Sequence, residues 1–163
     1  MAETVVGVIP DARIKTGMFK SEEWVLVVTD QRLLGARLTD ELKKQVVAEA
    51  KAEAKASGKG LLRQWGAQIK ASFSVGQRYL AMTPEQILAE TAGNWALLPA
   101  QVKQIKVEKK SRGGAGDDGP DIDFLRITIE TAAGKGTYET NDDKPGQKEV
   151  KEMLGRVFGS AVR

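Results

Sequence analysis

The sequence contains no histidine and no cysteine. Without histidine there is no imidazole to act as a general base near neutral pH, and without cysteine there is no thiol nucleophile, disulfide or cysteine-ligated zinc. The net charge is also small, because 25 Lys and Arg residues are nearly balanced by 22 Asp and Glu residues, which gives +3. So weak a charge argues against a nucleic-acid partner.

Long apolar runs are missing as well. The first run, over residues 5–9, ends at Pro10 and is too short for a signal sequence or a transmembrane span. The 163 residues, 41% hydrophobic and 29% charged, have the balance of one globular domain. We therefore expect a single cytoplasmic domain over residues 1–163, with no cofactor, no metal and no enzymatic activity.

The first forty residues have the composition of β-strands. A strand is predicted over residues 5–9, and it resumes over residues 12–16 beyond Pro10 and Asp11. Residues 23–29 are apolar on both faces, so this second strand is expected to be central and buried. A polar turn at Asp30 then leads into a third strand over residues 33–38, which forms a hairpin with the second.

Helical spacing replaces this pattern after residue 39. A first helix is predicted over residues 40–56, with apolar positions at Leu42, Val46, Val47, Ala50 and Ala54. A second helix, ending near residue 74, has one apolar face made of Leu61, Leu62, Trp65, Ile69 and Phe73. Thr83, Pro84 and Gln86 have the spacing of a capping box and predict a short helix to about residue 91. Residues 39–93 thus form a helical insertion.

Four more strands are predicted after the insertion, over residues 95–98, 102–109, 125–130 and 136–140. The connection over residues 110–121 is rich in glycine and is expected to be an exposed loop. A C-terminal helix follows, with an apolar stripe of Val150, Met153, Leu154, Val157 and Phe158. Seven strands and a terminal helix that covers an apolar end of the sheet give an α+β, mainly β fold.

Several segments resemble the bacterial PH-like and GRAM-like families. The stretch Val27-Val28-Thr29-Asp30-Gln31-Arg32-Leu33-Leu34 has their hydrophobic strand ending in Thr-Asp before a basic residue. Residues 7–10 with 17–19, residues 58–60 to 78–80, and residues 84–90 resemble an uncharacterised prokaryotic PH-like group with a helical insertion. The resemblance implies a PH-like seven-stranded bent antiparallel barrel capped by the C-terminal helix, with a helical hairpin inserted between the third and fourth strands.

The residues around the first hairpin differ from those of PH domains that bind phosphoinositides. Arg13, Lys15 and Lys20 are followed by Glu22 and Glu23, and these carboxylates should repel a polyanionic headgroup. The glycine-rich and aspartate-rich connection before residue 122 has neither the spacing of a phosphate-binding loop nor that of an EF-hand. Neither segment therefore predicts a phosphate or calcium site.

The inserted segment carries an unusual charge pattern. Between residues 54 and 84 there is no acid, and five positive residues form a candidate basic face: Lys55, Lys59, Arg63, Lys70 and Arg78. A basic amphipathic helix can lie on anionic lipid or dock into a partner's groove. The apolar side of the same helix can equally pack on the first inserted helix and the sheet, with the cations as its solvated face.

These observations predict a non-catalytic binding or assembly module. The leading hypothesis is protein interaction, including self-association, through the insertion or an open strand edge. The alternative is peripheral attachment to an anionic membrane through the basic inserted helix. A small hydrolase is the third hypothesis, and the lack of histidine weighs against it.

Overall fold

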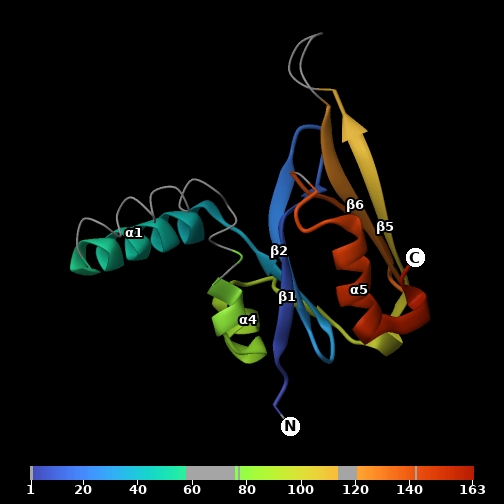
Figure 1. Cartoon of the computed structure of the whole chain (residues 1–163), viewed down its shortest axis with the longest axis horizontal. Helices are drawn as coiled ribbons and strands as arrows, with labels where there is room; N and C mark the ends of the chain where they lie inside the picture. Colours follow the sequence, from blue (N-terminus) through green and yellow to red (C-terminus); the bar gives the residue numbers. More distant parts are fainter. Residues whose placement is uncertain (1, 58–75, 77, 114–120, 142) are drawn as a thin grey trace.

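The computed structural model of the chain describes residues 2–57, 76, 78–113, 121–141 and 143–163. This part is mainly β, with one antiparallel sheet of seven strands in the order β4-β3-β2-β1-β7-β6-β5 (Figure 1). The strands are β1 (Val5–Lys15), β2 (Ser21–Thr29), β3 (Leu33–Arg37), β4 (Trp95–Leu97), β5 (Val102–Arg112), β6 (Ile122–Thr131) and β7 (Gly134–Glu139). The helices are α1 (Asp40–Ser57), α4 (Pro84–Glu90) and α5 (Gln147–Phe158), with 3₁₀ turns η1 (Arg78–Ala81), η2 (Pro99–Gln101) and η3 (Gly159–Ala161). The predicted α+β, mainly β class is confirmed.

Strand β1 continues past Pro10 and Asp11 through a β-bulge. Ile9 pairs with Leu26 and Ala12 with Trp24, so the register shifts between these pairs. Proline cannot donate to a ladder, and aspartate tolerates the left-handed region, where Asp11 has a φ of 59°. Beyond the bulge β1 also pairs with β7, with Arg13 opposite Glu139. The bulge therefore lies just before the point where β1 joins the two halves of the sheet.

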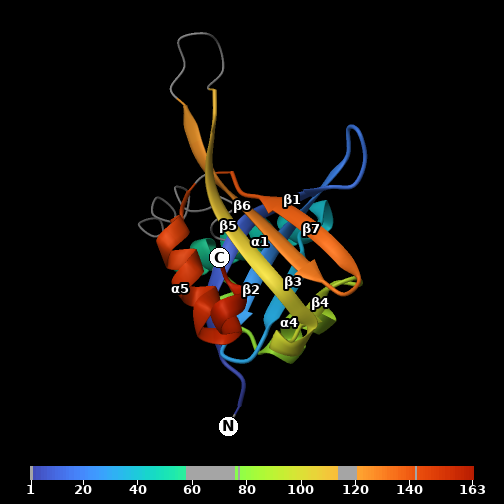
Figure 2. The ribbon, with the colours of Figure 1, turned by 90° about the vertical axis from the view of Figure 1, so that its right-hand side faces the viewer.

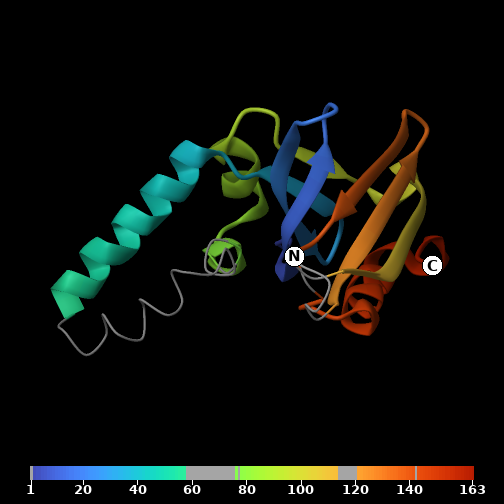
Figure 3. The same ribbon diagram turned by 90° about the horizontal axis from the view of Figure 1, so that it is seen from above.

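Strand β2 is buried on both faces, as its sequence predicts. On one face Leu26 packs in the larger core, between the two halves of the sheet and α5 (Figure 3). On the opposite face Val25 and Val27 belong to a second core, which includes Tyr79 of η1 and Ile87 of α4. Parts of the segment between β3 and β4 thus supply core residues to the sheet.

Helix α5 covers the larger core and lies beside β5 (Figure 2). Its Val150, Leu154 and Phe158 are buried, in agreement with the predicted apolar stripe. After η3 the chain runs along the edge of β5, where Val162 forms a parallel bridge with Ile105. The Val107 amide donates to the Arg163 carbonyl at 2.8 Å, and the Arg163 amide donates to the Ile105 carbonyl at 2.8 Å. These bonds satisfy part of the β5 edge.

The hairpin of β5 and β6 is longer than the sequence predicts. Residues 110–112 belong to β5 rather than to a loop, and Arg112 pairs with Ile122. The reason is cross-strand contact, since Ser111 donates to Asp123 and the Arg112 guanidinium lies 4.1 Å from the centre of the Phe124 ring. Residues 114–120 of the predicted loop lie outside the described residues.

Helix α1 projects away from the sheet (Figures 1 and 3). Its base is held by Leu42, which packs on Leu38 and Val46. The chain leaves the sheet after β3 and returns at β4, its neighbour, where the Arg37 amide donates to Asn94 Oδ1 at 2.8 Å. The second predicted helix, over residues 61–74, lies outside the described residues.

Candidate functional site

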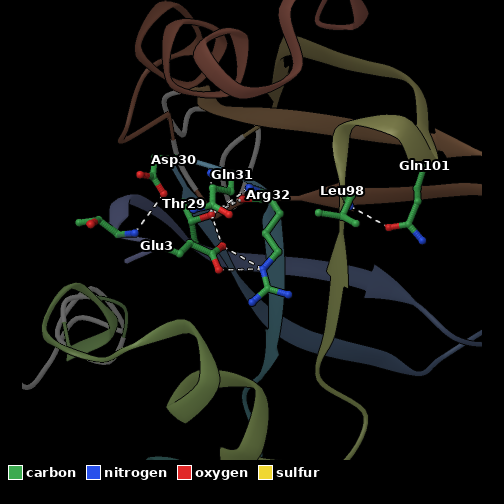
Figure 4. Close-up of polar contacts among 8 residues, drawn as sticks. Glu3, Thr29, Asp30, Gln31, Arg32, Leu98 and Gln101 are labelled. Carbon is green, nitrogen blue, oxygen red and sulfur yellow. Dashed lines mark hydrogen bonds and ion pairs between the residues drawn. The ribbon is translucent and has the colours of Figure 1, made fainter. Parts of the chain in front are cut away.

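The Thr-Asp segment behind the family resemblance forms a closed polar network (Figure 4). Arg32 Nε lies 2.8 Å from Glu3 Oε1 and 3.1 Å from Glu3 Oε2, and the Thr29 hydroxyl donates to Glu3 Oε1 at 2.5 Å. The same hydroxyl oxygen accepts the backbone amides of Gln31 and Arg32. The carboxylate of Glu3 thus has its hydrogen-bond and ion-pair partners within the same chain. The network fastens the N-terminal segment to the β2–β3 turn and is structural.

Arg78, the last member of the candidate basic face, is already paired within the chain. Its guanidinium lies 2.6 Å from Glu90 Oε2, and the hydroxyl of the buried Tyr79 donates to Glu90 Oε1 at 2.8 Å. Burial and this hydrogen bond to a carboxylate raise the pKa of Tyr79. These contacts join η1 to α4 and compensate the charge of Arg78.

The structure says less about the position of the other four members of the candidate basic face. Lys55 falls in α1. Lys59, Arg63 and Lys70 lie outside the described residues. The candidate basic face therefore stays a prediction from the sequence.

An apolar groove with a volume of about 490 Å³ lies between β1, η1 and α5. We refer to it as the groove, and its apolar lining consists of Val6, Val8, Pro10, Leu80, Pro145 and Met153. Val6 and Leu80 are 44% and 45% exposed, which is high for large apolar side chains. A Cβ on Gly7 would lie 2.2 Å from Met153 Sδ, so this glycine permits the close approach of α5 to β1. The groove volume is in the range of ligand and side-chain sites.

The charged residues of the groove are Lys144, Glu149, Glu152 and Arg156. Glu149 and Glu152 are exposed and stand three positions apart on α5, so their side chains lie on one side of the helix. Neither forms an ion pair with a residue that the structure describes. The α5 wall of the groove therefore offers two carboxylates to an incoming cation.

The β1–β2 hairpin ends in an exposed apolar pair. The turn is closed by the Thr16 amide, which donates to the Lys20 carbonyl at 2.9 Å. Met18 and Phe19 at its end are 89% and 97% exposed. Lys15 and Lys20 flank them, and neither cation is ion-paired with a described residue. We call these four residues the hairpin tip.

The acids next to the hairpin tip form ion pairs with cations of the same chain. Glu23 Oε1 lies 3.3 Å from Arg13, and its other oxygen lies 2.7 Å from Lys43. Glu22 lies 3.5 Å from Arg37 and also accepts the indole N–H of Trp24. The negative charges of Glu22 and Glu23, which the sequence predicts to repel an anionic ligand, are thus partly compensated by these ion pairs. The lysines of the tip have no such partner among the described residues.

A second cavity, of about 290 Å³, opens between β4 and the β6–β7 hairpin. Trp95 and Tyr138 form its aromatic wall, with ring centroids 6.4 Å apart. Burial raises the pKa of the Tyr138 hydroxyl. Trp95 crosses directly over Gly35, where a Cβ would lie 2.2 Å from its Cε2 atom. The large apolar residues of the cavity lining belong to the larger core or pack against it, so we regard the cavity as the open end of that core.

Within the described ranges, no group of three or more carboxylates is placed to hold a metal ion. None of the helices described here is long and apolar enough to cross a membrane. No family model matches the chain, and no curated protein or solved structure matches it either.

Sequence reasoning missed the groove and the exposed apolar pair of the hairpin tip. The tip had a signal, because a Met-Phe pair between two lysines in a glycine-containing turn cannot be buried by its own hairpin. The groove had none, since its walls come from three elements that are distant along the chain.

Proposed function

We propose that the chain is a non-catalytic binding module that holds a protein partner in the groove. The observation that carries this proposal is the exposure of Val6 and Leu80 within one apolar concavity. Exposed apolar side chains gathered at one concave place mark interaction sites, whereas scattered ones do not. The groove combines an apolar floor with a charged rim, the arrangement of protein recognition surfaces.

The proposed ligand is an apolar segment flanked by positive charge. The apolar floor would take one or two large side chains, and Glu149 and Glu152 would face the flanking cations. Lys144 and Arg156 line the same groove and would repel the cations of the ligand. We therefore expect those cations to lie beside the two glutamates.

We also propose that the fold is of the PH-like and GRAM-like kind, a bent barrel interrupted by the insertion over residues 39–93. The support for it is the antiparallel strand order and the position of α5 against β1, β2 and β5. The neighbouring ends of β3 and β4 at Arg37 and Asn94 support the insertion. Because this fold hosts many functions, the groove and not the fold carries the functional proposal.

Peptide titration tests the groove. We expect short peptides with two large apolar residues between two lysines to bind, and the same peptides with glutamates in place of the lysines to bind at least about tenfold more weakly, which fluorescence anisotropy measures. Leu80→Arg should abolish binding of the lysine peptides. Leu98→Arg is the matched control, since Leu98 is similarly exposed and lies outside the groove. Binding that Leu80→Arg leaves unchanged would contradict the proposal.

A second proposal is attachment to an anionic membrane, which the exposed apolar pair of the hairpin tip favours. Co-sedimentation with phosphatidylcholine vesicles, with and without phosphatidylserine, measures it. Loss of binding in Met18→Ser/Phe19→Ser would assign the contact to the tip. Loss in Lys59→Glu/Arg63→Glu/Lys70→Glu would assign it to the inserted segment.

A further inference from the structure

We infer that the occupant of the groove is the hairpin tip of a second copy of this chain. The inference rests on the groove as a protein-binding site and names its partner. The tip of one molecule would enter the groove of the next, so that the chain associates head to tail.

The first argument is the match in apolar surface. Phe19 and Met18 are the two most exposed large apolar side chains that the structure describes. The β1–β2 hairpin that carries them projects from the sheet (Figure 2), and their exposure shows that no described element of the same chain covers them. The groove presents Val6 and Leu80 half-exposed and is wide enough for such side chains. Contact between tip and groove would remove both apolar surfaces from water.

The second argument is charge. Lys15 and Lys20 bracket the apolar pair, and Glu149 and Glu152 border the groove. All four side chains are exposed, and none forms an ion pair with a described residue. Opposite charges around an apolar contact fix its orientation and disfavour other arrangements.

The tip cannot enter the groove of its own molecule. Pro10 lies in the groove and Lys15 at the base of the tip, and both belong to β1, which β2 holds on either side of the bulge. At about 3.3 Å per residue, the five steps between them separate the two sites by roughly 16 Å of strand. The contact is therefore intermolecular. Because it joins two different surfaces, the contact either closes reciprocally, with each tip in the groove of the other molecule, or continues into a ring or an open chain of molecules.

An anionic membrane is the less favoured occupant. The β5–β6 hairpin projects on the same side of the molecule as the β1–β2 hairpin (Figures 1 and 2). It carries the exposed Asp121. This carboxylate would accompany the tip toward an anionic surface and oppose binding to it.

Sedimentation velocity over a range of protein concentrations tests the inference. We expect the wild-type chain to associate, and the tip variant Met18→Ser/Phe19→Ser and the groove variant Leu80→Arg each to be monomeric at the same concentrations. Leu98→Arg should associate as the wild type does. An equimolar mixture of the tip and groove variants should form a 1:1 dimer and nothing larger, because only one intact tip and one intact groove can meet.

Charge exchange provides a test that leaves the apolar residues intact. Lys15→Glu/Lys20→Glu should raise the dissociation constant at least about tenfold, and adding Glu149→Lys/Glu152→Lys to the same chain should restore association. Circular dichroism and cooperative thermal unfolding check that each variant is folded. Recovery in the fourfold variant would support a direct contact between these charges.

Several results would overturn the inference. They are a wild-type chain that stays monomeric at all concentrations, a tip variant that associates normally, or a mixture of tip and groove variants that stays monomeric. A monomeric wild type that binds anionic vesicles through the tip would assign the tip to a membrane instead. If self-association fails while Leu80→Arg abolishes binding of the lysine peptides, the proposed function survives with another protein as partner. If Leu80→Arg leaves peptide binding unchanged, the proposed function itself fails.

Discussion

At the scale of single residues, two glycines show how the surroundings of a Cβ decide the effect of a substitution. Gly35 lies beneath Trp95, whose ring also neighbours Trp24 with centroids 6.2 Å apart. Gly155 lies within α5 with nothing within 4 Å of its Cβ position. The first glycine makes room for a rigid aromatic ring, and the second only weakens a helix.

We expect opposite effects from alanine at these two positions. Gly35→Ala should displace Trp95 and lower the free energy of unfolding by about 1 to 3 kcal/mol, as overpacking does. Gly155→Ala should raise it by about 0.5 to 1 kcal/mol, because alanine favours the helix. Urea denaturation followed by tryptophan fluorescence measures both. Equal changes in the two variants would show that Trp95 is free to move.

The phenol of Tyr79 predicts a loss of stability at high pH. Burial and its hydrogen bond to Glu90 raise its pKa above the ordinary value of 10.0. Above that pH the unfolded chain releases the phenol proton while the folded chain retains it, so stability falls as pH rises; below it the full contribution is present. The difference in unfolding free energy between the wild type and Tyr79→Phe should therefore shrink above pH 10.0. A difference independent of pH would contradict the buried hydrogen bond.

At the scale of elements, α5 is expected to be indispensable because Leu154 is buried in the larger core. Leu154→Ala should lower the free energy of unfolding by about 2 to 5 kcal/mol, as truncation of a core leucine does. Lys148→Ala, on the exposed side of the same helix, should have little effect. A loss below about 0.5 kcal/mol for Leu154→Ala would mean that the apolar stripe of α5 is not packed.

The segment between β3 and β4 should divide into a dispensable and an essential part. Replacing residues 47–75 with a Gly/Ser linker should preserve cooperative unfolding, because no side chain of the two main cores comes from the described part of that range. Replacing residues 39–93 should abolish it, since Tyr79 and Ile87 are fully buried against β1, β2 and β3. Thermal unfolding by circular dichroism distinguishes the two deletions. A cooperative transition in the longer deletion would show that the second core is not needed.

Elements that local sequence determines could be predicted, whereas features that depend on contacts between distant parts of the chain could not. Thr83 and Gln86 form both hydrogen bonds of the predicted capping box, because a cap is decided within one turn of chain. The end of β5 was predicted too early, since the stacking of Arg112 on Phe124 joins residues that sequence periodicity does not connect. The groove is a further case, because a strand, a 3₁₀ turn and a helix from distant parts of the chain must meet to form it.

At the scale of the whole molecule, β1 to β3 form a layer with a core on each side. The larger core lies toward α5, and the second core lies toward η1 and α4. The strands at the two ends of the sheet, β4 and β5, differ from this layer in length or in how much of their outer edge is paired. β4 has three residues, and β5 is bordered by the C-terminal residues only around Ile105 and Val107.

The double burial of β2 has a consequence for hydrogen exchange. The amides of residues 26–28 lie in a stretch that is paired with both β1 and β3 and covered on both faces, so a local opening would have to break two ladders and two cores. We expect these amides to exchange with deuterium only through global unfolding, and amides at the start of α1 and in the hairpin tip to exchange orders of magnitude faster. Exchange measured by NMR in increasing denaturant gives the opening free energy of each amide. If those of β2 opened more readily than those of α5, the two-sided layer would not be the last part of the molecule to unfold.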